Sequence, residues 1–399
     1  MTSSGTPSRR PKDIIEGADA VVVLNHLVAE AFQVGASDIH LEPKAELMQV
    51  RVRVDGRLVE QRPVAHDVAL QVVSRVKVLA RMDITERRVP QDGQFALDLG
   101  TQHRVHVRAS TFPCSQGEKV VLRLLRGSTT IAFEKLGMSP ESQKMVRDLV
   151  VRPQGFVVTC GPTGSGKTST LYSFLQLIDT SKINVVTLED PIEVELPSIT
   201  QGQANPRAGF TFALGLRAIL RQDPDVILVG EIRDSETAGI ALQAALTGHM
   251  VMSTLHTSDT VETIVRLVDL GIEPWIIANS LTAVIAQRLV RVVCPSCVEP
   301  YELENDFYDG DQLLMPAGTV TIRPRGCTWC LRTGYRGRTA LYEVLENDDE
   351  LRDLIKTKGT APLFRMALKR RGFTSLRRVG YEKVLAGITT IDEVIRVTT

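Results

Sequence analysis

The stretch Gly161-Pro162-Thr163-Gly164-Ser165-Gly166-Lys167-Thr168 decides the fold of most of this 399-residue chain. It matches the pattern G-x-x-x-x-G-K-[ST], and it lies between an apolar run and a helical segment that starts near Ser169. In such a loop the glycines let successive backbone N–H groups turn inward around a phosphate, and the lysine reaches the β- and γ-phosphate oxygens. We therefore expect residues 161–169 to bind the phosphates of ATP, with Thr168 as a ligand of Mg²⁺.

Short apolar runs accompany this loop. They lie at residues 156–158, 185–188, 226–229 and 250–252, with helical stretches between them. Strands that are buried on both faces and alternate with helices are typical of a parallel sheet. We therefore predict an α/β domain whose ligand binds at the carboxyl ends of the strands.

Polar residues follow three of these apolar runs. The strand expected at 183–188 leads to Glu189, the next strand leads to Glu231, and the strand after that leads to His256. ATP hydrolysis needs a carboxylate to position or deprotonate water and a metal to bridge the phosphates. Position favours a direct catalytic or metal role for Glu231, whereas spacing alone leaves Glu189 and His256 open between catalysis and a structural role.

Five arginines are further candidates. Arg217 and Arg221 are one helical turn apart, so they either face a nucleotide together or pair with surface acids. Arg104 and Arg108 share one face of an expected strand, and Arg88 precedes a turn. These three form either a solvated protein face or arginine fingers that are supplied across a domain or subunit boundary.

The first 130 residues show a different pattern. Helical spacing of apolar residues predicts amphipathic helices at 18–33 and 67–82. Alternation of apolar and polar residues predicts strands at 48–54, 103–109 and 119–125. This region is predicted to be a small α+β domain.

Six cysteines are present, and four of them form two C-x-x-C pairs, Cys294-Pro295-Ser296-Cys297 and Cys327-Thr328-Trp329-Cys330. Two such thiolate pairs can close a tetrahedral zinc site, although their separation is longer than in a usual zinc ribbon. In a reducing compartment the pattern favours structural Zn²⁺ over free thiols, with no ligand position left for catalysis. The other two cysteines, Cys114 and Cys160, are expected in the core.

Composition excludes several classes of protein. The chain has 47 Lys+Arg and 47 Asp+Glu, which argues against a bulk nucleic-acid binder, and 43% of its residues are hydrophobic, as in a globular protein. No stretch approaches the roughly 20 consecutive apolar residues needed to cross a bilayer, and the polar N-terminal segment lacks the features of an export signal. We therefore expect a cytoplasmic protein whose membrane contact, if any, is peripheral.

Further motifs occur in order along nearly the whole chain. They are Ala36-Ser37-Asp38-Ile39-His40-Leu41-Glu42-Pro43, Arg88-Val89-Pro90-Gln91-Asp92-Gly93, Leu188-Glu189-Asp190-Pro191-Ile192-Glu193, Gly230-Glu231, Leu246-Thr247-Gly248-His249, Ser253-Thr254-Leu255-His256-Thr257 and Gly334-Tyr335-Arg336-Gly337-Arg338. Together with the phosphate loop and the four cysteines, they resemble the secretion ATPases of the type II secretion and type IV pilus assembly family (GspE/PilB).

The resemblance implies a fold and a set of domains. It implies a RecA-like P-loop NTPase domain, an N-terminal α+β domain that is PAS-like, a tetracysteine zinc subdomain and a helical C-terminus. We expect a disordered tail at 1–15, the arginine-supplying N-terminal domain at 16–130, the ATPase core at 131–290, the zinc subdomain at 291–345 and the helical region at 346–399.

The resemblance also implies an activity. It implies a Mg²⁺-dependent ATPase that forms a homo-hexamer and associates with the inner membrane through a platform and other secretion or pilus assembly proteins. Carried over by motif, Glu231 is the general base, Glu189 assists at metal or water, and His256 senses the γ-phosphate. The three arginines of the first domain would complete the site on domain closure.

Two features separate this chain from other members of the family. Members that act in secretion or pilus extension usually carry another N-terminal domain, whereas the resemblance here starts within about 40 residues, so the chain is either a short member or a truncated one. Pilus retraction motors lack the tetracysteine motif, and a retraction motor is the nearest alternative function. A RecA-like nucleic-acid translocase and a scaffold that binds ATP without turnover are more distant alternatives.

Overall fold

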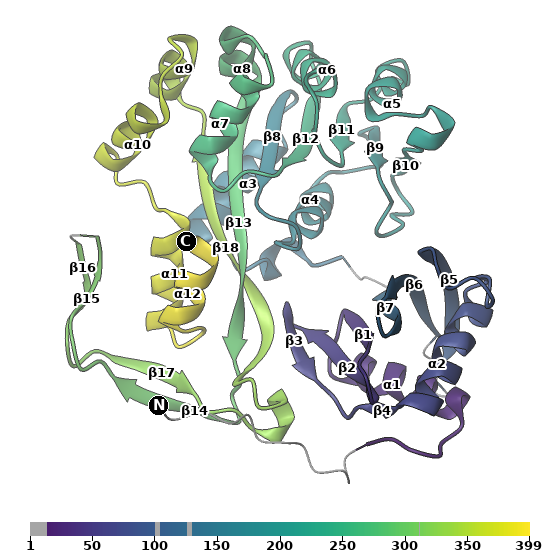
Figure 1. Ribbon diagram of the computed structural model, residues 1–399. Helices are drawn as coiled ribbons and strands as arrows, with labels where there is room; N and C mark the ends of the chain where they lie inside the picture. Colours follow the sequence, from purple (N-terminus) through teal and green to yellow (C-terminus); the bar gives the residue numbers. More distant parts are fainter. Residues whose placement is uncertain (1–13, 100–103, 126–129, 311) are drawn as a thin grey trace. The chain divides into compact units, whose positions relative to one another are not determined.

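The computed structural model describes residues 14–99, 104–125, 130–310 and 312–399. The chain divides into two compact units, Met1–Ser128 and Thr129–Thr399 (Figure 1). The tail expected at 1–15 lies outside the described residues except for its last two. Of these, Ile15 forms an isolated β-bridge with Val64, so backbone pairing begins before the expected boundary.

The first unit is an antiparallel sheet packed with two helices, which is the predicted α+β arrangement. Its strand order is β3-β2-β1-β7-β6-β5, and β4 pairs with β2. The elements are α1 (Ala20–Gln33), β1 (Asp38–Pro43), β2 (Leu47–Val54), β3 (Arg57–Glu60), β4 (Val64–Ala65), α2 (His66–Leu79), β5 (Gln91–Asp98), β6 (Arg104–Cys114) and β7 (Gly117–Leu125). Residue 103 of the strand expected at 103–109 lies outside the described residues.

Side-chain alternation explains how β2 is placed in this sheet. Met48, Val50 and Val52 are buried in the core of the unit, while the residues between them remain partly exposed. β2 turns into β3 at Asp55 and Gly56, which both have positive φ, as a two-residue type I′ hairpin turn requires.

The second unit is built on a seven-stranded sheet with the order β10-β9-β11-β12-β8-β13-β18. The strands from β10 to β13 run parallel, and β18 is antiparallel to β13. The elements of this part are η2 (Phe133–Lys135), α3 (Pro140–Val150), β8 (Gly155–Cys160), α4 (Lys167–Leu175), β9 (Val185–Glu189), β10 (Thr200–Gln203), η3 (Pro206–Ala208), α5 (Phe212–Ile219), β11 (Val226–Val229), α6 (Ser235–Leu246), β12 (Met250–Leu255), α7 (Thr260–Asp269), α8 (Pro274–Ser280), β13 (Leu281–Val293) and β18 (Tyr335–Glu346).

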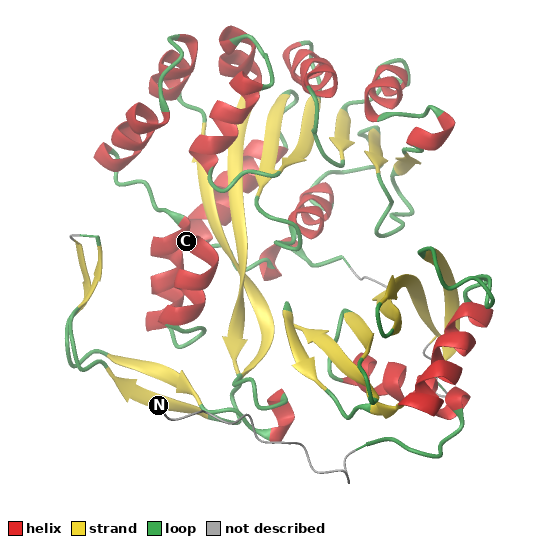
Figure 2. Ribbon diagram, in the orientation of Figure 1, coloured by secondary structure: helices red, strands yellow, loops and turns green. Residues whose placement is uncertain are grey.

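Helices cover both faces of this sheet (Figure 2). On β11, Ile227 and Val229 belong to one apolar cluster, to which α6, α7 and α8 also contribute. Val226 and Leu228 belong to a second cluster, which includes residues of α3 and α4. Because successive side chains of a strand point to opposite faces, the two clusters lie on opposite sides of the sheet. This confirms the predicted α/β domain with doubly buried strands.

β13 and β18 form a long antiparallel hairpin, and its connection holds the four cysteines. The pairing runs from Ala283–Glu346 to Val293–Tyr335. The region expected as a zinc subdomain at 291–345 therefore ends with a strand of the central sheet. The connection contains β14 (Val298–Glu302), β15 (Phe307–Asp309), β16 (Gln312–Met315), β17 (Val320–Pro324) and η4 (Thr328–Cys330).

Helices follow β18, as expected for residues 346–399. They are α9 (Asp349–Lys356), α10 (Ala361–Arg370), α11 (Leu376–Leu385) and α12 (Ile391–Thr398). Pro362 lies in the first turn of α10, where proline is tolerated, and Gly372 follows the end of this helix with a φ of 67°. Among the described helices, none combines the length and the apolar character that crossing a membrane requires.

Candidate functional site

The phosphate loop connects β8 to α4, as its motif predicts. Gly161, Gly164 and Gly166 have φ values of 147°, 79° and 90°, which residues with side chains rarely adopt. A Cβ atom on Gly161 would lie 2.6 Å from the carbonyl oxygen of Gln287 on β13. Backbone conformation and close packing therefore both require glycine at this position.

Lys167 is buried at the start of α4. Its Nζ donates hydrogen bonds to the carbonyl oxygens of Gly161 (2.8 Å) and Pro162 (3.1 Å). Burial lowers the pKa of this ammonium, and the nearby Glu231 carboxylate acts in the opposite direction. Among the described residues, no carboxylate forms an ion pair with Lys167. An anion bound in the loop would therefore balance the positive charge of this buried ammonium and of the N-terminus of α4.

The first turn of α4 carries two more residues of the predicted site. Thr168 is half-buried and Ser169 is exposed. Both follow Lys167 directly at the helix N-terminus, where backbone N–H groups and the helix dipole favour negative charge. The position of Thr168 fits a hydroxyl that binds the magnesium ion of a Mg²⁺–ATP complex.

Glu231 and His256 meet at the carboxyl edge of the sheet. The Nε2 atom of His256 lies 3.2 Å from Oε2 of Glu231, and Arg233 donates from Nη2 to Oε1 at 2.6 Å. Burial alone would raise the pKa of Glu231, but the hydrogen bonds and charges of Arg233 and His256 outweigh it and lower the pKa. Glu231 is therefore an ionised carboxylate that follows β11, one strand removed from the phosphate-loop strand β8, and its charge acts on Lys167.

Glu189 is placed differently. It is the last residue of β9, and only 3% of its surface is exposed. Its Oε2 accepts a hydrogen bond from the Tyr172 hydroxyl on α4, and its Oε1 accepts from Thr187 (2.6 Å) and Gln201 (3.1 Å). The Glu189 carboxylate thus connects α4 to the strands β9 and β10.

Arg217 lies on α5, but Arg221 lies in the turn after this helix, so the two do not share a helix as expected; both are on the protein surface. Arg217 forms an ion pair with Glu236 of α6 at 2.7 Å, and Arg221 donates to the carbonyl oxygen of Arg217 at 2.8 Å. Of the two alternatives left by the sequence, the structure shows the pairing with a surface acid for Arg217. Contact with a nucleotide stays a prediction for both residues.

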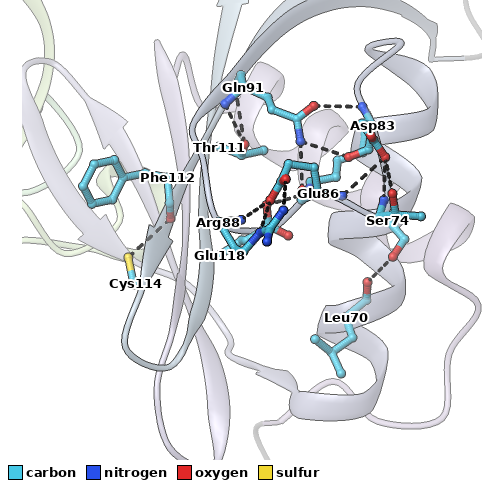
Figure 3. Close-up of polar contacts among 12 residues, drawn as sticks. Leu70, Ser74, Asp83, Glu86, Arg88, Gln91, Thr111, Phe112, Cys114 and Glu118 are labelled. Atoms are coloured by element: carbon cyan, nitrogen blue, oxygen red, sulfur yellow. Dashed lines mark hydrogen bonds and ion pairs between the residues drawn. The ribbon is translucent and has the colours of Figure 1, made fainter.

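The arginines of the first unit are exposed. Arg88 is 87% exposed, and its backbone N–H, Nε and Nη2 donate to the carboxylate of Glu86 at 2.7, 3.0 and 2.7 Å (Figure 3). Gln91 fastens the same loop through hydrogen bonds with the backbone of Asp83 and Glu86. Arg104 and Arg108 alternate with buried valines on β6, so the described unit shows them as a solvent-facing row.

The four cysteines lie together at the end of the β13–β18 hairpin. Their sulfur atoms are within 4.8 Å of one another, and the closest pairs are 3.7, 3.8 and 3.9 Å apart. Four thiolates at a Zn–S distance of about 2.3 Å in a tetrahedron lie about 3.8 Å from each other, so the spacing fits zinc. Cys160 is buried as expected, but Cys114 is exposed at the end of β6, so its expected core position was wrong.

Sequence reasoning missed two residues that border the phosphate loop. Gln287 is 1% exposed and donates from Nε2 to the carbonyl oxygen of Ser165 at 2.6 Å. Arg288 follows it, and its Nη1 would lie 3.2 Å from a Cβ atom on Gly161. No local motif marks either residue, because the contact depends on β13 pairing with β8 in the sheet.

Comparisons with known proteins agree with this geometry. A model of the family "Type II/IV secretion system protein" matches residues 16–396. The type II secretion system ATPase E of Vibrio cholerae is 46% identical over 391 residues, which cover 97% of this chain and 77% of that protein. The type IV pilus assembly ATPase PilB of Acinetobacter baylyi is 42% identical over 390 residues, covering 96% of this chain and 66% of that protein.

Solved structures show the same fold. The Legionella pneumophila ATPase DotB superposes with a TM-score of 0.70 at 24% identity and covers 96% of this chain and 98% of its own. The pilus retraction motor PilT with bound ADP superposes with a TM-score of 0.61 at 27% identity and covers 94% of this chain and 96% of its own. The family match along nearly the whole chain, together with the phosphate loop and the carboxylate beside it, shows that this chain belongs to the type II/IV secretion system protein family.

Proposed function

We propose that this chain is a Mg²⁺-dependent ATPase motor that drives type II secretion or type IV pilus assembly. The observation that carries the proposal is the contact of Glu231 with His256 at the sheet edge that holds Lys167 and the phosphate loop. The similarity to secretion and pilus assembly ATPases at 42–46% identity supports the choice of system.

The residues of the second unit have distinct roles in this proposal. Lys167 releases the loop carbonyls and binds the β- and γ-phosphate oxygens, and Thr168 binds Mg²⁺. Magnesium, when bound, neutralises charge on the phosphates. Glu231, held ionised by its neighbours, accepts a proton from the attacking water, and His256 adjusts this carboxylate to the presence of the γ-phosphate.

Glu189 supports the site indirectly, by fixing the position of α4. We place it in a positioning role, because its carboxylate already accepts three hydrogen bonds and is removed from solvent. Through Tyr172 it fixes the helix whose first turn carries Lys167 and Thr168. Assistance at metal or water, as the family resemblance implies, would require this cluster to open.

The arginines support a proposal about assembly. Arg88, Arg104 and Arg108 are exposed cations on the first unit, and an arginine that stabilises transition-state charge is often supplied by a neighbouring domain or subunit. We propose that they act in this way within a homo-hexamer, and that Arg217 and Arg221 contact the nucleotide. In that assembly the motor stays in the cytoplasm and reaches the inner membrane through its partner proteins.

The hydrolysis rate of Mg²⁺–ATP, measured against protein concentration, tests the proposal. Specific activity should rise steeply over the concentration range in which mass in solution shows oligomers, and Lys167→Ala should abolish it. A rate that is independent of assembly would contradict arginines supplied by a neighbouring copy. Absence of phosphate release at every concentration would instead favour a nucleotide-gated scaffold.

The hydrolysis assay with added DNA and a measurement of bound zinc separate the alternative functions. Stimulation by DNA that disappears at raised salt would favour a nucleic-acid translocase. A chain without bound zinc would remove the feature that distinguishes it from a retraction motor. The cysteine geometry supports a zinc-binding extension motor, with Cys294, Cys297, Cys327 and Cys330 as the ligands.

A further inference from the structure

Arg288 joins three parts of the second unit that are far apart in sequence. It lies on β13, which pairs with β8 up to Ala286–Cys160, so it follows the sheet into the start of the phosphate loop. Its Nη2 donates to the carbonyl oxygen of Ser258 at 2.6 Å, and its Nε donates to that of Val397 in α12 at 3.0 Å. A single guanidinium thus holds both the loop after β12 and the last helix.

The loop that Arg288 holds is the one that presents His256. It comprises residues 256–259, between β12 and α7. The Thr257 hydroxyl lies 2.6 Å from that of Thr263, and the backbone N–H of Ser258 donates to Glu262 at 3.1 Å. Asp259 caps α7 through the backbone N–H of Glu262. The backbone on the C-terminal side of His256 is thus fastened at successive residues, while the imidazole itself contacts Glu231.

Arg288 links this loop to β13, the neighbour of the phosphate-loop strand β8, in addition to the contact between the Cys160 Sγ atom on β8 and the carbonyl oxygen of Asp259. The contacts of Thr257 and of the Ser258 N–H lead only to α7, whereas the carbonyl oxygen of Ser258 is bonded to β13. A planar guanidinium can donate in two directions from fixed positions, which a lysine ammonium on a flexible stem does not reproduce. The β12–β8 ladder, which ends at Leu255–Cys160, places the start of this loop beside the phosphate-loop strand, and Arg288 adds a contact that fixes the backbone just after His256.

We propose that Arg288 is a positioning residue that holds the backbone after His256 against β13, beside the phosphate-loop strand β8, and connects it to α12. The proposal rests on the role assigned above to His256. An error of about 1 Å in the placement of a group that takes part in the reaction lowers turnover about a hundredfold. Loss of the Arg288 contacts should therefore lower kcat while leaving nucleotide binding to the loop nearly intact.

The test is a double-mutant cycle with Arg288→Lys and His256→Ala in the full chain. R288K should lower kcat about tenfold or more, with the KM for Mg²⁺–ATP and the Kd of a fluorescent ADP analogue within about twofold of the original chain. In the H256A background, R288K should have almost no further effect on kcat, because the imidazole that Arg288 positions is already absent. Arg396→Lys is the matched control, since Arg396 lies on α12 and pairs with Glu393 away from the loop.

The outcomes separate this inference from the proposed function. Normal turnover in H256A would contradict the role of His256 itself. Two other results would overturn the positioning role of Arg288 alone, provided that H256A turns over slowly. One is an unchanged kcat in R288K, and the other is a loss of kcat from R288K that is just as large in the H256A background. Thermal unfolding of each variant shows whether it is folded. Glu262→Ala loosens the same loop from its other side and should show the same dependence on His256, which provides a second variant should R288K not fold.

Discussion

Replacing Glu231 with glutamine removes its charge and keeps its shape. The partners of the carboxylate are solvent-accessible, since the Arg233 and His256 side chains are 69% and 47% exposed. Loss of these ion pairs should therefore cost at most about 1 kcal/mol of the free energy of unfolding. Loss of a general base lowers a rate about 10²- to 10⁴-fold, which corresponds to about 3–5 kcal/mol in the activation barrier. Glu231→Gln should thus abolish turnover in a chain of nearly unchanged stability.

Glu189→Gln is the matched comparison, because it makes the same chemical change in a buried carboxylate. The amide would leave at least one of the hydroxyl donors Tyr172 and Thr187 without an ionised acceptor, which costs about 1–3 kcal/mol. At roughly 2–4 °C per kcal/mol for a domain of this size, the unfolding midpoint should fall by several degrees. Turnover should fall less than in Glu231→Gln.

Three measurements on both variants complete this comparison. Phosphate release at saturating Mg²⁺–ATP gives kcat, titration with a fluorescent ADP analogue gives the affinity, and thermal unfolding gives stability. Glu236→Gln, which changes a surface partner of Arg217, serves as the control for a charge change alone. The reasoning would be refuted if Glu231→Gln retained more than a tenth of the original rate, or if the two variants had the same unfolding midpoint.

Three further predictions concern packing, metal and pH. Gly161→Ala should lower the free energy of unfolding by about 3 kcal/mol, because its Cβ atom would strain the backbone and overlap with β13. Gly164→Ala has open space around it and should cost about 1 kcal/mol. Equal thermal unfolding midpoints for the two variants would contradict the packing argument. Metal analysis should find one zinc per chain. The zinc should be lost when any of the four cluster cysteines is replaced by serine and retained in Cys114→Ser. Zinc that remains bound after the cluster replacements would exclude this site. Burial would raise the pKa of Glu393, but the bonds and charges of Arg291 and a second arginine lower it to about 2 from 4.5, so this carboxylate stabilises the fold above pH 4.5 and the stabilisation disappears as pH falls toward 2. The difference in stability between the original chain and Glu393→Gln should shrink over that range in acid titrations followed by circular dichroism.

The location of the site was predictable from the sequence, because each local signal there has a direct structural consequence. Apolar runs predicted parallel strands, and parallel strands end at a common edge. The residues that follow β11 and β12, Glu231 and His256, therefore come together although 24 residues separate them. The glycines of the phosphate loop likewise have the positive φ values that their motif requires.

Burial within the site was not predictable in the same way. Glu189 and Glu231 both lie near the ends of strands in the sequence, yet the first is enclosed by Tyr172 and Gln201, whereas the second is 15% exposed and has solvent-accessible partners. The difference arises from β10, which pairs with β9 and brings Gln201 over the Glu189 carboxylate. Contacts of this kind depend on strand order, which periodicity does not specify. The same holds for Gln287, which is 122 residues from Ser165, to which it donates.

The β13–β18 hairpin shows why the cysteine pairs are so far apart in sequence. Gln287 touches the phosphate loop, and Cys294 lies seven residues later, directly after the end of the same strand, about 23 Å away at roughly 3.3 Å per residue. At that distance a zinc ion cannot take part in phosphate chemistry. A metal held by the four cysteines would instead join the two ends of the inserted segment, lowering the entropy cost of a long connection between paired strands. Because the backbone ladder from Val293–Tyr335 to Ala283–Glu346 is continuous apart from one bulge, the cysteine cluster and the residues that border the phosphate loop belong to one hydrogen-bonded hairpin.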